Sequence, residues 1–117
     1  MEKAVLILNE GPGSMKSWNA LRIAAGLVGI DMEVEIFLID AAAYIALKDQ
    51  HPPEGLKELN LARKLTDLMD LGIKINACAT CIDAGGVKKE YMVEGVTVTT
   101  LTDLSKSVKT CKNVMVF

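Results

Sequence analysis

Two cysteines three positions apart, Cys78 and Cys81, are the residues of this 117-residue chain whose types and spacing best suit chemistry. They stand in residues 76–86, NACATCIDAGG, directly after a short apolar run. A cysteine between a strand and a helical turn faces backbone N–H groups and the helix dipole, and both favour thiolate over thiol. Thiolates attack disulfides, persulfides and electrophiles. The pattern predicts Cys78 as a reactive sulfur and Cys81, one turn further on, as its partner.

The residues around the two thiols fit a small sulfur-containing ligand. Gly85 and Gly86 allow the backbone to come close to such a species, and we expect Thr80 and these two glycines to contact it. The alternative is that Cys78 and Cys81 are two small buried hydrophobic side chains, because free cysteine is often buried and inert. Cys111 is expected to be a core residue of this kind.

Metal binding is not predicted for these thiols. One CxxC pair supplies two ligands, whereas a structural zinc site takes four. Cys111 and His51 are the other soft ligands, and neither stands at a ligand-type spacing. His51 lies in a proline-rich loop and is expected to be exposed rather than catalytic. No metal and no other cofactor is therefore expected.

The turn at residues 10–14, EGPGS, is a second candidate for ligand binding. It could hold an anion at a helix N-terminus through Gly11, Gly13 and Ser14. It lacks the Gly-Lys-Ser/Thr of a Walker loop, and it is not GxGxxG. A tight structural turn is the stronger interpretation, although the turn could still border the pocket around Cys78.

Apolar runs alternate with helical patterns along the chain. Strands are expected at residues 3–9, 33–40, 73–78, 95–99 and 113–117, and helices at 14–29, 41–47, 56–71, 87–92 and 101–111. Gly72 fits the position after the third helix, and Thr100 with Asp103 resembles a capping box for the last helix. This order predicts a single α/β domain, residues 1–117, with a mostly parallel sheet covered on both faces.

Ligands of such sheets bind outside the carboxyl ends of the strands. The loops at that edge are residues 10–14, 40–43, 78–86 and Thr100. The thiol pair and the glycine turn are therefore expected on the same edge of the sheet.

Composition narrows the class of function. The formal net charge is −2 and charged residues make up 24% of the chain, with no basic cluster, so nucleic-acid binding is not expected. The first apolar run is too short for a secretory signal or a membrane span. A cytoplasmic location is expected, where three cysteines remain reduced and serve redox or catalytic roles more often than disulfides.

The chain resembles the DsrE/DsrF-like family, most closely its small YchN-like branch, over essentially its whole length. The resemblance is carried most strongly by residues 75–87, INACATCIDAGGV. Residues 9–14, 38–41, 50–55, 95–96 and 100–104 also fit.

The resemblance implies a three-layer α/β/α domain with a five-stranded parallel sheet and a homo-oligomer, a trimer or hexamer. Its sulfur-relay members carry a persulfide on one cysteine, which corresponds to Cys78, and pass it to a partner protein. Cys81 matches the second cysteine of the YchN-like branch, and many relatives have Arg-Gly in place of Gly85-Gly86.

The leading hypothesis is therefore a cytoplasmic sulfur-carrier or persulfide-relay protein, similar to a sulfurtransferase, with sulfur donor and acceptor proteins as partners. The alternative is a non-enzymatic homo-oligomeric binding or scaffold protein whose thiols are incidental.

Overall fold

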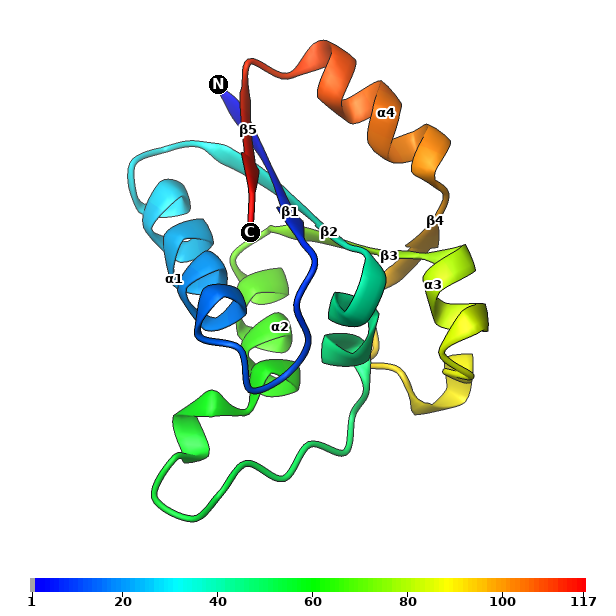
Figure 1. Ribbon diagram of the computed structural model, residues 1–117. Helices are drawn as coiled ribbons and strands as arrows, with labels where there is room; N and C mark the ends of the chain where they lie inside the picture. The colour runs from blue at the N-terminus through cyan, green and yellow to red at the C-terminus, as the bar shows by residue number, and fades with distance from the viewer. Residues whose placement is uncertain (1) are drawn as a thin grey trace.

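A five-stranded sheet whose strands all run parallel forms the centre of the computed structural model, which describes residues 2–117 (Figure 1). Met1, the first residue of the predicted domain, lies outside the described residues. The strand order is β4-β3-β2-β1-β5. The bounds of the strands are Lys3–Leu8 for β1, Glu33–Leu38 for β2, Lys74–Cys78 for β3, Thr97–Thr99 for β4 and Asn113–Val116 for β5. The prediction of an α/β fold with a parallel five-stranded sheet is confirmed.

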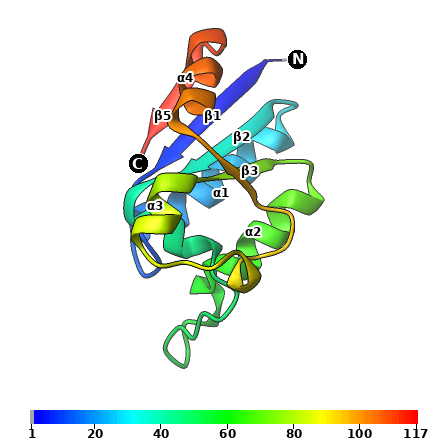
Figure 2. The same ribbon diagram turned by 90° about the vertical axis from the view of Figure 1, so that its right-hand side faces the viewer.

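Helices cover both faces of this sheet (Figures 1 and 2). Helices α1 (Met15–Gly29) and α2 (Leu61–Asp70) pack on the face that presents Leu6 and Ile36, where the larger core lies. Helix α4 (Leu101–Thr110) packs through Leu104 on the opposite face. Because β1, β2 and β3 are buried on both faces, their sequences are apolar over most of their length.

Three helical segments differ from the sequence-based expectation. The helix expected at 56–71 is divided into a 3₁₀ turn, Lys57–Leu59, and α2, because the Asn60 side chain accepts a hydrogen bond from the Arg63 N–H (3.1 Å) and caps α2. The segments expected as helices at 41–47 and 87–92 are 3₁₀ helices, η1 (Asp40–Ala46) and η3 (Lys89–Tyr91). The helical turn after Cys78 is α3 (Ala79–Ala84).

The last helix begins as expected, and its apolar side chains are buried to different degrees. Thr100 and Asp103 form the capping box that the sequence predicts. Leu104 is buried, whereas Leu101 is 52% exposed and Val108 is 38% exposed. Cys111 lies just beyond the helix, half-buried against the smaller core cluster, so it packs from the C-cap position rather than from the helix face.

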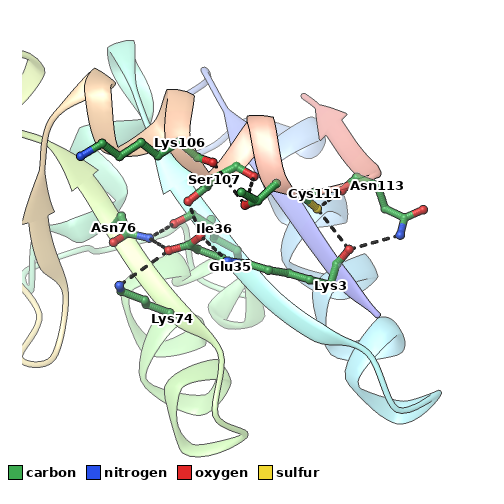
Figure 3. Close-up of polar contacts among 10 residues, drawn as sticks. Lys3, Glu35, Ile36, Lys74, Asn76, Lys106, Ser107, Cys111 and Asn113 are labelled. Atoms are coloured by element: carbon green, nitrogen blue, oxygen red, sulfur yellow. Dashed lines mark hydrogen bonds and ion pairs between the residues drawn. The ribbon is translucent and has the colours of Figure 1, made fainter. Parts of the chain in front are cut away.

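A buried carboxylate joins α4 to the sheet (Figure 3). Glu35 on β2 is 6% exposed. It accepts hydrogen bonds from Ser107 Oγ on α4 (2.8 Å) and from Asn76 Nδ2 on β3 (3.1 Å), and it pairs with Lys3 Nζ on β1 (3.1 Å). Burial by itself raises the pKa of Glu35, but the hydrogen bonds from Ser107, Lys3 and Asn76 outweigh burial and hold the pKa below its ordinary value.

Glu35→Gln is expected to lower the free energy of unfolding by about 2 kcal/mol, because a charged acceptor of several hydrogen bonds is lost. The lowered pKa means that this contribution is present above the ordinary value of 4.5 and is lost as the pH falls through the folded-state pKa. Urea unfolding of both proteins as a function of pH should show the difference shrinking below pH 4.5.

Glu33→Gln is the matched control, since Glu33 is two residues away on the same strand and exposed. It should change stability by less than about 0.5 kcal/mol. Equal effects of the two substitutions would contradict the role assigned to Glu35.

Candidate functional site

The carboxyl ends of β2 and β3 lie side by side, because the two strands pair in parallel with Leu38 opposite Ala77. The chain leaves β2 into η1, which begins at Asp40, and leaves β3 into α3 (Figure 1). The loops predicted at residues 40–43 and 78–86 therefore meet at this edge of the sheet.

The two thiols differ in their access to solvent. Cys78 is the last residue of β3 and the N-cap of α3, and it is 4% exposed. Cys81 lies one turn further along α3 and is half-buried. Both are free thiols. Cys81 is the thiol of the pair that borders a cavity.

The backbone N–H of Asp40 donates a hydrogen bond to Cys81 Sγ at 3.1 Å. Asp40 has a φ of +53°, in the left-handed region. This conformation costs a residue with a Cβ about 1 kcal/mol or more, although Asp adopts it more readily than most residues. The unusual backbone at the end of β2 thus directs a donor at the sulfur.

The expected N–H groups around Cys78 are not found. Cys78 is the N-cap residue of α3, but its buried side chain makes no capping hydrogen bond to that helix. The backbone N–H that contacts a thiol of this pair instead donates to Cys81, and it belongs to Asp40 at the start of η1.

Burial raises the pKa of the Cys81 thiol. The Asp40 N–H acts in the opposite direction, whereas the neighbouring Cys78 thiol and the Asp40 carboxylate add to the increase. The raised pKa therefore favours the thiol form of Cys81 over the thiolate.

A cavity of 310 Å³, the thiol cavity, lies beside Cys81. It is lined by Asp40, Ala41, Tyr44, Thr80, Cys81, Ala84 and Gly85. Thr80 and Gly85, both predicted to contact a ligand, are therefore in the same cavity as the Cys81 thiol. Gly86, with a φ of +67° that favours glycine, borders an adjoining cavity of 240 Å³.

Tyr44 is the residue of this site that the sequence did not indicate. Its hydroxyl donates a long hydrogen bond of 3.5 Å to the Gly85 carbonyl. A Cβ at Gly85 would lie 2.8 Å from Tyr44 Oη and 3.0 Å from Cζ, so the tyrosine occupies the space that a side chain at 85 would need. The signal that could have indicated Tyr44 is its position four residues after Asp40, on a helical turn that faces α3.

The glycine turn lies outside the thiol cavity. Gly11 packs on the backbone of Ala41, and a Cβ at position 11 would lie 3.0 Å from the Ala41 carbonyl oxygen. Because Ala41 lines the thiol cavity, Gly11 supports the wall of that cavity from outside. Gly13 borders a separate cavity of 290 Å³ that also includes the exposed His51. Ser14 Oγ donates to Glu10 Oε1 at 2.7 Å, within the turn itself.

Among residues 2–117, no three His, Cys, Asp or Glu side chains are grouped so that they could hold a metal ion. Within the same residues, no helix has the length and apolar character needed to cross a membrane.

Comparison with known proteins gives consistent matches over the whole chain. The family model described as DsrE/DsrF-like matches residues 2–117. Uncharacterized protein MJ0989 of Methanocaldococcus jannaschii is 35% identical over 116 residues, which are 98% of this chain and 99% of that protein. Protein YchN of Escherichia coli is 29% identical over 120 residues, which span both chains completely. The crystal structure of the E. coli ychN protein superimposes with a TM-score of 0.89 and 28% identity over the full length of both chains.

The raised pKa of Cys81 predicts slow alkylation at neutral pH. The rate at which iodoacetamide alkylates Cys81 can be followed on its peptide by mass spectrometry as a function of pH. This rate should still be increasing at pH 9.0, the ordinary pKa of a cysteine thiol. In Cys78→Ala the half-maximal rate should move to lower pH, because the neighbouring thiol no longer opposes ionisation. A half-maximal rate below pH 9.0 in the unsubstituted protein would contradict the raised pKa.

Gly85→Ala is expected to lower stability by about 1–3 kcal/mol, because the new methyl group overlaps the Tyr44 hydroxyl. In a Tyr44→Ala background the same substitution should cost much less, since Oη and Cζ are absent. Denaturant unfolding of the four proteins measures this coupling. An equal cost in both backgrounds would show that Tyr44 does not restrict position 85.

Proposed function

This chain belongs to the DsrE/DsrF-like family, and on that basis we propose that it carries sulfane sulfur on the thiol pair of Cys78 and Cys81. The observation that carries the proposal is the position of Cys81 Sγ, which borders a cavity and accepts a hydrogen bond from the Asp40 N–H at 3.1 Å. A second thiol, Cys78, lies next to it at the N-cap position of α3.

The first step is transfer from a persulfide donor, R–S–SH. Cys81 gives up its proton as its sulfur attacks the outer sulfur of the donor, so that the donor S–S bond breaks and an S–S bond to Cys81 forms. The released R–S⁻ takes up a proton. No oxidant is needed, because one neutral sulfur atom moves between two thiols. The Asp40 N–H supports the negative charge that Cys81 carries as it attacks.

The second step uses Cys78, the cysteine to which the family resemblance assigns the persulfide. The Cys78 thiolate attacks the outer sulfur of the Cys81 persulfide, which moves the sulfane sulfur to Cys78 and returns Cys81 to a thiol. Since Cys78 is 4% exposed, the sulfur is shielded there from water and other thiols. Attack on the inner sulfur would instead release HS⁻ and leave a Cys78–Cys81 disulfide.

The acceptor is a thiol of a partner protein, and a carrier of this kind requires a reducing compartment such as the cytoplasm. Self-association into a trimer or hexamer is supported by apolar side chains exposed on α4 and β5, such as Leu101 at 52% and Val116 at 66%.

A second candidate function is favoured by the raised pKa of Cys81. A thiol that resists ionisation is a poor nucleophile. In this case the chain would be a non-enzymatic oligomeric binding or scaffold protein, and the thiols would serve packing.

Mass spectrometry after incubation with glutathione persulfide distinguishes the two functions. The unsubstituted protein and the control Cys111→Ser should each gain one sulfur atom. Cys81→Ser should load at least about tenfold more slowly, because the accessible thiol is removed. Cys78→Ser should load on Cys81 but lose the sulfur quickly, since no shielded thiol receives it.

Two outcomes would refute the carrier proposal. One is the absence of any adduct on the unsubstituted protein. The other is an adduct on Cys78→Ser that is as long-lived as that on the unsubstituted protein. Either result would leave the scaffold function as the better account.

A further inference from the structure

A second cavity of 240 Å³ adjoins the thiol cavity. The two share Tyr44 and Gly85 in their walls, so they meet at the contact between these residues. The lining residues of the second cavity come from η1, from the residues just after η1 and from the segment at the end of α3 and beyond. An isolated β-bridge between Leu47 and Met92 joins these two parts of the chain. With volumes of 310 and 240 Å³, the two cavities together reach the range of small-molecule sites, about 300–1,000 Å³.

The second cavity holds one charge of each sign. Lys88 and Asp49 both border it, together with the rings of Tyr44 and Tyr91. Across residues 2–117, neither the Lys88 ammonium nor the Asp49 carboxylate takes part in an ion pair or a side-chain hydrogen bond. The nearby Lys48 differs, because its Nζ donates to the Glu90 carbonyl at 3.0 Å. The cavity therefore offers an uncommitted cation and an uncommitted anion to a ligand.

The thiol cavity, in contrast, offers the sulfur with few charges. Its wall is mainly small or apolar at Ala41, Ala84 and Gly85, and the Asp40 backbone N–H points to Cys81. A ligand that occupies both cavities would need a compact sulfur end and a zwitterionic end. A persulfide of a small amino acid has both.

We infer that the second cavity binds the amino-acid end of a low-molecular-weight persulfide, with the α-carboxylate at Lys88 and the α-ammonium group at Asp49. The sulfane sulfur of this donor then lies in the first cavity at Cys81. This inference rests on the proposed function and adds the class of the sulfur donor to it. Tyr44 and Gly85 line both cavities, so the middle of the ligand would lie against these two residues.

The test uses S-methyl-L-cysteine, a thioether with the same zwitterionic end that cannot transfer sulfur. Titration of ¹⁵N-labelled protein should shift the amide signals of residues 44–49 and 85–91. Lys88→Ala should weaken binding about tenfold, because a charge-assisted hydrogen bond is lost. Asp49→Asn should weaken it in the same direction.

Lys89→Ala is the matched control, since Lys89 is the next residue, is exposed, and does not border either cavity. It should bind the probe as the unsubstituted protein does. The N-acetyl methyl ester of S-methyl-L-cysteine, which carries neither charge, should bind weakly to all variants. No binding of the zwitterionic probe, or equal effects of the Lys88 and Lys89 substitutions, would overturn the inference.

The same variants separate this inference from the proposed function. Because the probe contains no transferable sulfur, Lys88-dependent binding supports the site even if persulfide loading fails. If Cys81 is loaded from cysteine persulfide equally fast in Lys88→Ala and Lys89→Ala, the carrier function remains and the amino-acid site is refuted. That result would point to a donor that presents its sulfur from a protein surface.

Discussion

The parallel pairing of β2 with β3 is the constraint on which the site depends. It places Leu38 opposite Ala77, so both strands end at the same level of the sheet. The next residues of each strand must then leave at one edge, and this brings Asp40 within 3.1 Å of Cys81 although 41 residues separate them in the chain. Antiparallel neighbours would have put the two loops at opposite ends of the sheet.

Close contact between η1 and α3 shapes the cavity that this pairing creates. Asp40 adopts a left-handed conformation to begin η1, and one turn later Tyr44 rests on Gly85. The same tyrosine occupies the space that a side chain at position 85 would need. This chain therefore combines a glycine at position 85 with a tyrosine from the adjacent segment, and Lys88 borders the adjoining cavity.

The opposite face of the sheet has a different arrangement, in which polar contacts supplement a small apolar cluster. Helix α4 buries Leu104, and Ser107 binds the Glu35 carboxylate, which also contacts β1 and β3.

The sequence by itself determined the order and type of most elements, because apolar runs and capping residues such as Thr100 are local signals. It also located the thiol pair, since Cys78 directly follows a strand. Three features depended on the tertiary structure: the accessibility of Cys81 rather than Cys78, the donor from Asp40, and the contact of Tyr44 with Gly85. Each depends on the meeting of segments about 40 residues apart, and the register that brings them together is a property of the whole sheet, for which no local pattern is sufficient.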